Sequence, residues 1–253
     1  MLRIISIVGL LLLSLFSEAT DTQIMVRAKA KDAKFIGSSI GGALVIIRNQ
    51  QTGEVMATGI TEGSTGNTEL IMNTPVQRRS QLTDEKTAGY LATVDINEPT
   101  LIRVEVTAPI NQRQSMAVAT TELWLIPGKH LTGDGIVLEI PGYVIDVLTP
   151  RAHERITLSS LENGEIKIQA NIVMMCGCPI TSGGIWDADG IEVKAQIKKD
   201  GALTDEISLS VTETSLFEGS FQPAEAGNFE IIIYAYDPVT SNTGVDKVNF
   251  ILN

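Results

Sequence analysis

The sequence has few of the residues that catalytic and metal sites most often use. Its 253 residues include two histidines, His130 and His153, and two cysteines, Cys176 and Cys178. Two histidines are too few for a catalytic zinc site of three histidines within one chain. A Ser-His-Asp site would have no α/β pattern to hold it, and no phosphate-binding loop or dinucleotide fingerprint is present. These absences predict that the protein is not an enzyme.

Positive charge is the scarcer sign. Lys and Arg number 19 against 30 Asp and Glu, so the net charge is −11. A groove that follows nucleic-acid phosphates needs clustered basic residues, and we therefore expect no nucleic-acid partner. The chain is nevertheless 43% hydrophobic. That content is enough to bury a core, and it excludes a disordered chain.

The one long apolar run lies at the N-terminus. Arg3 precedes an apolar run over residues 4–16, and Ser17 and Ala19 supply the small residues of a cleavage site. The run is shorter than the stretch of about 20 residues that a membrane-spanning helix needs. Residues 1–19 are therefore predicted to be a signal peptide. We expect residues 20–253 to be exported to the periplasm, the cell surface or the medium, with no membrane span after cleavage.

Apolar and polar residues alternate along the rest of the chain, as in strands with one buried face. The alternation is clearest over residues 24–29, 102–108, 166–172 and 191–198. Turn signals such as Asn163-Gly164 divide these segments, and no long segment has apolar residues at helical spacing. The sequence predicts an all-β protein with two antiparallel β-sandwich domains in tandem.

A domain boundary is predicted between Thr149 and Pro150, because proline cannot donate to a strand ladder and restrains the residue before it. Residues 150–253 then have about the length of an immunoglobulin-like sandwich. Residues 20–149 form a longer first domain, whose extra length indicates an insertion near residues 73–88. That stretch is polar and charged. It could form a short helix or a mobile loop, with either a binding role or none.

Residues 41–61 resemble a known kind of sandwich. A strand over residues 43–49 is followed by Thr-Gly-Glu at residues 52–54 and by a strand that ends in Thr-Gly-Ile-Thr at residues 58–61. This order resembles the transthyretin-like, carboxypeptidase-regulatory-like β-sandwich. That family usually continues into an Asp-Gly turn, which this chain lacks. The resemblance implies a sandwich fold and an accessory role in an exported protein, and it carries over no catalytic residue.

The C-terminal part is similar to bacterial immunoglobulin-like modules. The similarity lies in residues 217–223, in residues 226–231, in Ala-Tyr-Asp at residues 235–237 and in the turn over residues 241–244. It implies an immunoglobulin-like fold for the second domain. It implies no particular activity, because such sandwiches have many roles.

The chemically unusual stretch is Met-Met-Cys-Gly-Cys-Pro at residues 174–179. Thiolate and thioether sulfurs are soft ligands, which select Cu(I) over hard cations. The candidate metal ligands are Met174, Met175, Cys176, Cys178 and, further upstream, His153.

Two other interpretations of this stretch stay open. In an oxidising compartment Cys176 and Cys178 can form a disulfide or serve as structural thiols. Alternatively, Met174, Cys176 and Cys178 share the parity of Ile172, so a straight strand would place them in the core as small apolar residues.

The loop that follows adds two weaker signals. Trp186 either caps a site beside the cysteines or closes one end of the sandwich. Asp187 and Asp189 have the spacing that begins a calcium-binding loop, but the twelfth position holds Lys198 in place of the glutamate of an EF-hand. A looser calcium site with Asp237 or Asp246 stays an alternative.

These observations leave three functional hypotheses. The first is an exported, non-enzymatic β-sandwich protein that acts as a binding or structural module in the cell envelope. Its partner would be another envelope protein or a surface component. The second is a copper-binding or copper-carrier protein that uses residues 174–178. The third is a thiol–disulfide redox protein, although the usual Cys-x-x-Cys on a βαβ unit is absent.

Overall fold

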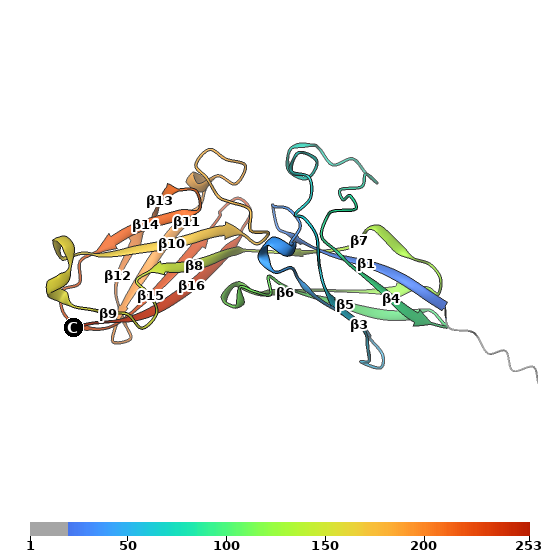
Figure 1. The fold of residues 1–253 in the computed structure, drawn as a ribbon, viewed down its shortest axis with the longest axis horizontal. Coiled ribbons are helices and arrows are strands. Elements are labelled where there is room, and N and C mark those ends of the chain that lie inside the picture. Colours follow the sequence, from blue (N-terminus) through green and yellow to red (C-terminus); the bar gives the residue numbers. More distant parts are fainter. Residues whose placement is uncertain (1–19) are drawn as a thin grey trace, which may run out of the picture.

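The computed structural model describes residues 20–253, so the signal peptide predicted for residues 1–19 lies outside the described residues. Four β-sheets form two sandwiches, one after the other along the chain (Figure 1). This arrangement confirms the all-β prediction. Over residues 20–253, no helix has the length and the apolar content that crossing a membrane requires.

The first sandwich pairs a three-stranded sheet, in the order β4-β1-β7, with a four-stranded sheet, in the order β3-β2-β5-β6. Its strands are β1 (Thr20–Ala30), β2 (Leu44–Asn49), β3 (Val55–Ile60), β4 (Tyr90–Ile96), β5 (Thr100–Ala108), β6 (Ala117–Leu125) and β7 (Leu131–Ile140). β1 and β7 run parallel, whereas β1 and β4 and the strands of the second sheet pair antiparallel.

The second sandwich pairs a four-stranded sheet, β13-β14-β10-β8, with a five-stranded sheet, β12-β11-β15-β16-β9. Its strands are β8 (Tyr143–Thr149), β9 (Arg155–Ile156), β10 (Ile166–Met174), β11 (Glu192–Lys199), β12 (Ala202–Ser208), β13 (Ser210–Glu213), β14 (Leu216–Phe221), β15 (Gly227–Tyr236) and β16 (Thr243–Leu252). Only the short β9 pairs in parallel, with the end of β16.

The apolar residues that alternate with polar ones in the sequence form the buried core. In β5 the side chains of Ile102, Val104 and Val106 are fully buried, and in β10 the same holds for Ile168 and Ile172. The side chains that alternate with them, Arg103, Glu105, Gln169 and Asn171, are partly exposed. Burying each such aliphatic side chain stabilises the fold by roughly 1.5–3 kcal/mol, so a one-residue shift of either strand would be strongly unfavourable.

The change from the first pair of sheets to the second comes earlier than the predicted boundary at residue 150. β8 precedes that boundary, yet it pairs with β10 of the second sandwich. Only Pro141 and Gly142 separate β7 from β8. The sequence interpretation missed this because Pro150 is a stronger local signal than the short break at Pro141. The division into independently folding domains stays a prediction.

The insertion expected near residues 73–88 lies between β3 and β4 and contains no strand. The one-turn helix η2 (Glu69–Asn73) ends where the segment begins. The loop is nevertheless anchored, because the Asp134 carboxylate accepts hydrogen bonds from the backbone N–H groups of Leu82 and Thr83 at 3.0 Å each. Figure 1 shows this segment rising from the first sandwich.

Candidate functional site

The two sandwiches meet end to end, and hydrogen bonds cross between them. The Asn242 side chain, only 1% exposed, accepts a hydrogen bond from the Gly142 N–H at 2.9 Å and donates to the Lys31 carbonyl at 3.1 Å. Its amide thus ties the turn before β16 to the end of β1 and to the link between β7 and β8. A buried amide satisfied on both sides favours one fixed geometry.

Two further contacts cross the junction at other points. The indole N–H of Trp186 donates to the Asp32 carbonyl at 2.9 Å. The Gln114 side chain, in η3 (Arg113–Ser115), donates to the Ile145 carbonyl at 3.1 Å and to the Asp146 carboxylate at 2.7 Å. Asn242, Trp186 and Gln114 therefore join the sandwiches through three separate segments.

Beside this junction, the chain reverses direction at the end of β10. The Met174 N–H donates to the Cys178 carbonyl at 3.0 Å, and the Gly177 N–H donates to the Met174 carbonyl at 2.7 Å. Gly177 has a φ of 75°, which glycine adopts without strain. A Cβ at this position would lie 3.4 Å from Ile40 of η1 (Ser38–Ile40), so the loop contacts the first sandwich.

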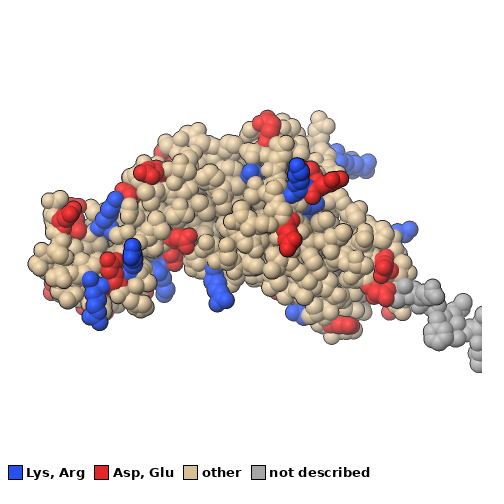
Figure 2. Space-filling view, viewed as in Figure 1, with Lys and Arg blue, Asp and Glu red and all other residues tan. Residues whose placement is uncertain are grey.

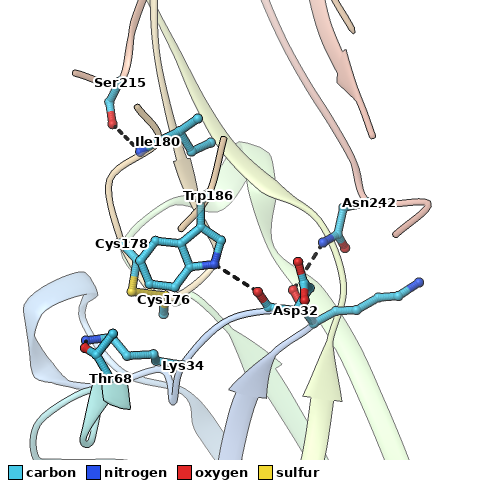
Figure 3. Close-up of a disulfide and its surroundings, with 10 residues drawn as sticks. Asp32, Lys34, Thr68, Cys176, Cys178, Ile180, Trp186, Ser215 and Asn242 are labelled. Carbon is cyan, nitrogen blue, oxygen red and sulfur yellow. Dashed lines mark hydrogen bonds between the residues drawn. A yellow bond between two sulfur atoms is a disulfide. The ribbon is translucent and has the colours of Figure 1, made fainter. Parts of the chain in front are cut away.

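Cys176 and Cys178 are joined by a disulfide within this loop, and both are buried, at 0% and 5% exposure. Figure 3 shows Trp186 between this disulfide and the turn that carries Asp32. Of the three interpretations that the sequence left open, the structure contains the disulfide. It also places Met174 and Met175 in the core next to it, at 2% and 3% exposure.

The metal site proposed from the sequence belongs only to the reduced chain, because a disulfide has no thiolate to offer. Met174, Met175, Cys176 and Cys178 do lie together in one buried segment. Within residues 20–253 no cluster of three or more His, Cys, Asp or Glu is arranged to hold a metal ion. The copper hypothesis also depends on the methionine sulfurs, which such a cluster does not include. It therefore stays a prediction.

His153 does not join this group, which corrects its place among the candidate ligands. Its backbone N–H donates to the Asn249 carbonyl at 2.7 Å. The cysteine loop lies at the opposite end of β16, where Gly142 faces Thr243. Positions 243 and 249 are six residues apart in the strand, which corresponds to roughly 20 Å. His130 lies in the first sandwich, where its Nδ1 accepts a hydrogen bond from the Gln23 N–H of β1 at 3.1 Å.

Residues 37–41 read Gly-Ser-Ser-Ile-Gly, which matches the pattern Gly-x-Ser-x-Gly. In an α/β-hydrolase this motif forms a strand-to-helix elbow that exposes the central serine. Here it contains the single 3-10 turn η1 between β1 and β2, and neither described histidine bonds to Ser39. The match therefore lacks the structural context that would give it catalytic meaning.

The loop over residues 181–190 is held by its own carboxylates. Asp187 accepts hydrogen bonds from the N–H groups of Gly183 and Asp189, at 2.8 and 3.1 Å. Asp189 in turn accepts from the Ser182 hydroxyl at 2.5 Å. These bonds explain the Asp-x-Asp spacing as loop structure. They also place Trp186 at the junction, where it closes the end of the sandwich.

A cavity of about 180 Å³ opens beside Trp186, between the two sandwiches. The residues that line it include two aromatic residues, Tyr143 and Trp186, and three acidic residues, Asp32, Asp187 and Asp237. Two larger hollows, of about 600 and 580 Å³, lie elsewhere on the second sandwich. In the larger of these, Lys167 and Glu218 pair with each other at 3.0 Å.

Two of the acidic residues that line the small cavity, Asp32 and Asp237, have pKa values shifted in opposite directions. Burial, followed by the nearby charge of Asp237, raises the pKa of Asp32. Burial acts in the same direction on Asp237, but hydrogen bonds from the Thr240 hydroxyl and from backbone N–H groups outweigh it and lower the pKa of Asp237. Burial and the charges of Asp237 and Asp32 raise the pKa of Tyr143, which therefore stays protonated.

Charged side chains of both signs are interspersed on the molecular face in Figure 2, and no extended basic area covers that face. Several charges on the second sandwich form pairs, such as Lys198 with Glu230 at 3.4 Å and Lys194 with Glu192 at 3.3 Å. Exposed pairs of this kind contribute little to stability.

Comparisons with known proteins give no family assignment. A scan against protein-family models finds no match, and no curated protein matches the sequence. Among solved structures, the major pilin subunit BcpA of Bacillus cereus aligns with 92% of this chain and 69% of its own, at 10% identity and a TM-score of 0.36. The fibronectin(III)-like modules of Clostridium thermocellum CbhA align over 92% and 94% of the two chains, at 14% identity and a TM-score of 0.28.

An engineered protein aligns over 51% of this chain, at 12% identity and a TM-score of 0.33, and the match spans only 24% of that protein. Likenesses at these scores carry no argument about function. The transthyretin-like resemblance stays a prediction.

Proposed function

We propose that this chain is a non-enzymatic, exported module in which two β-sandwiches are held in one fixed arrangement to bind or space components of the cell envelope. The observation that carries the proposal is the junction. Asn242, Trp186 and Gln114 connect the sandwiches from three separate segments. Free movement of the two sandwiches would break the hydrogen bonds that this buried amide makes through its oxygen and its nitrogen.

A measurement of tumbling tests this proposal. In ¹⁵N relaxation experiments the two sandwiches should share one rotational correlation time. The double variant Asn242→Ala, Gln114→Ala should give them separate, shorter correlation times, because the Gly142 N–H and the Lys31 carbonyl lose their partner. Leaving such buried groups unpaired costs about 1–3 kcal/mol each.

The matched control is Gln196→Ala, which removes a side-chain hydrogen bond to Glu206 on the surface of the second sandwich. This variant should tumble like the native protein. Independent correlation times in the native chain would contradict the proposal.

Copper binding is a second candidate, favoured by the four sulfur side chains that lie together in the buried segment. It applies to the reduced chain. An anaerobic titration of reduced protein with Cu(I) should show uptake of one ion, which Cys176→Ala and reoxidation should each abolish.

Thiol–disulfide exchange has less support, because both sulfurs are buried and an exchanging partner must reach one of them.

A further inference from the structure

The strand β6 forms one edge of the sheet β3-β2-β5-β6. All nine of its residues, Ala117–Leu125, pair with β5 without a shift of register. The pairings of the edge strands β3, β7, β8, β12 and β13 each contain such a shift. Bulges, prolines and lysines commonly protect an edge against another strand, and β6 has none of the three. Its outer edge is therefore a regular template for strand pairing.

The backbone groups on this outer edge belong to the even-numbered residues of β6. The Gln50 N–H donates to the Leu101 carbonyl at 2.9 Å, so the N–H and C=O groups of odd-numbered β5 residues point toward β2. Even-numbered β5 residues therefore bond to the odd-numbered β6 residues that they face, as Val104 faces Thr121. Within residues 20–253, no backbone hydrogen bond from another strand reaches the remaining groups of β6. These belong to Val118, Thr120, Glu122 and Trp124.

Apolar side chains of β6 are only partly covered on both faces of the sheet. Val118 and Trp124 are 59% and 57% exposed on the outer face. On the inner face, Ala119 and Leu123 pack against the core but stay partly exposed. The strand has a single charged residue, Glu122. A strand added at this edge would therefore cover apolar surface on both faces and desolvate little charge.

The open backbone groups allow β6 to pair with β6 of a second copy. In an antiparallel pair about a two-fold axis at Thr121, even-numbered residues face even-numbered residues, and each such pair exchanges two N–H···O bonds. Thr120 of one copy then faces Glu122 of the other. Moving the axis to Glu122 would set the two Glu122 carboxylates opposite each other, which destabilises a sheet. Moving it to Thr120 would set Trp124 opposite Met116, which lies outside the strand.

The sizes of the side chains favour the same axis, because smaller residues of one copy face larger residues of the other. On the outer face Val118 meets Trp124, and pairs of an aromatic with a β-branched residue stabilise antiparallel sheets. On the inner face the pairs are Ala117 with Leu125 and Ala119 with Leu123. The strand is thus complementary to itself in size and in charge.

We propose that this chain forms a two-fold dimer in which β6 pairs antiparallel with β6 of a second copy about Thr121. The pairing joins the four-stranded sheets of the two copies into one continuous sheet. It occupies both open edges, so assembly stops at the dimer. A single pair of strands is a small interface, and the dissociation constant should be on the order of 0.1 mM. The proposal goes beyond the proposed function and does not depend on the junction, because β6 belongs wholly to the first sandwich.

Amide hydrogen exchange followed by NMR tests the pairing residue by residue. The amides of Val118, Thr120, Glu122 and Trp124 should exchange about fourfold more slowly at about 1 mM protein than at about 20 µM, because the dimer protects them. The amides of Ala119, Thr121 and Leu123 bond to β5 and should exchange slowly at both concentrations. Sedimentation equilibrium on the same samples should show a monomer–dimer equilibrium.

Two substitutions of Thr120 separate pairing from folding. Thr120→Pro removes an N–H that points to solvent in the monomer, and an edge strand tolerates proline at such a position. It should abolish the dimer, while slow exchange of the Thr121 amide shows that β6 still pairs with β5. The matched control, Thr120→Val, keeps the N–H and should dimerise like the native chain.

Thr120→Lys tests the register. A lysine on an edge strand ordinarily opposes pairing. About the axis at Thr121, however, each introduced lysine faces Glu122 of the other copy, so the dimer should tighten about threefold.

Five outcomes would overturn the proposal. They are a native chain that stays monomeric at the higher concentration, assemblies larger than a dimer, slowed exchange that spares the even-numbered amides, a native-like dimer in Thr120→Pro, and a weaker dimer in Thr120→Lys.

Discussion

Asp32 illustrates how a residue at a turn acquires significance only in the folded chain. In the sequence it is one of many acidic residues in a polar stretch. In the structure its carbonyl receives the Trp186 indole N–H, while its carboxylate faces Asp237, Glu139 and Lys29. Burial and the charge of Asp237 together raise the pKa of Asp32.

This raised pKa predicts a pH dependence of stability. The folded protein holds a proton on Asp32 more tightly than the unfolded chain does, so Asp32 increases the free energy of unfolding as the pH falls from neutral through its folded pKa. Asp32→Asn should therefore be more stable than the native protein at neutral pH, by less than about 1 kcal/mol because the group is solvated. The difference should shrink toward acidic pH.

Urea unfolding of both proteins across this pH range gives the comparison. Asp146 has a pKa raised by burial and by Asp246, and it titrates in the same direction in both proteins. It therefore cancels in the difference. A difference between the two proteins that is constant with pH, or of the opposite sign, would contradict the role of Asp32.

The candidate site could be predicted from the sequence only where its residues are adjacent. Cys176 and Cys178 are two residues apart, and the disulfide was one of three alternatives that their spacing allowed. Asp32, Tyr143 and Asn242 come from three distant parts of the chain, and no local pattern brings them together. The only signal near Asn242 was the turn over residues 241–244 that the immunoglobulin-like resemblance included.

Among the elements, strands that alternate cleanly were predictable and their exceptions were not. The alternation places Arg27 on the exposed face of β1, but Arg27 is only 4% exposed. Its guanidinium donates to the carbonyls of Thr87 and Ala88, the latter at 2.8 Å. The segment that covers Arg27 arrives 60 residues later in the chain, so the strand pattern alone could not reveal it.

Arg27 therefore anchors the loop over residues 74–88, and its replacement should release that loop. Arg27→Met preserves much of the side-chain bulk but removes every guanidinium donor. We expect trypsin to cleave at the exposed Arg78 and Arg79 at least several-fold faster in the variant, because cleavage tracks the population of the open loop. The sandwich strands lie outside the loop, so both fragments should stay associated in the native fold.

The control is Arg113→Met, which changes an exposed arginine in η3 whose side chain makes no hydrogen bond within the described residues. It should leave cleavage at Arg78 and Arg79 unchanged. Equal cleavage rates in Arg27→Met and the native protein would show that other contacts, such as those of Asp134, suffice to hold the loop.

For the molecule as a whole, composition and alternation predicted two sandwiches, whereas their junction depends on contacts between remote residues. The Asn242 side chain and the Lys31 carbonyl are 211 residues apart in sequence, and Trp186 and Asp32 are 154 apart. Such contacts depend on how the sandwiches pack. Local patterns in the sequence could not reveal them.

The disulfide and the expected signal peptide lead to a joint prediction about the whole chain. A disulfide persists in an oxidising compartment and is rare in a reducing cytosol. A bacterium that produces the full chain should therefore export a protein that begins at Thr20 and carries the Cys176–Cys178 bond. A chain produced without residues 1–19 should stay in the cytosol with both thiols reduced.

Intact-mass spectrometry after acid quench and thiol alkylation measures both properties in one sample. The exported protein should lack residues 1–19 and take up alkylating reagent only after denaturation and reduction. The cytosolic protein should alkylate at both cysteines once it is denatured. An exported chain that retains residues 1–19, or whose cysteines alkylate on denaturation without reductant, would contradict the assignment to an oxidising compartment, and with it the envelope role that the proposed function assumes.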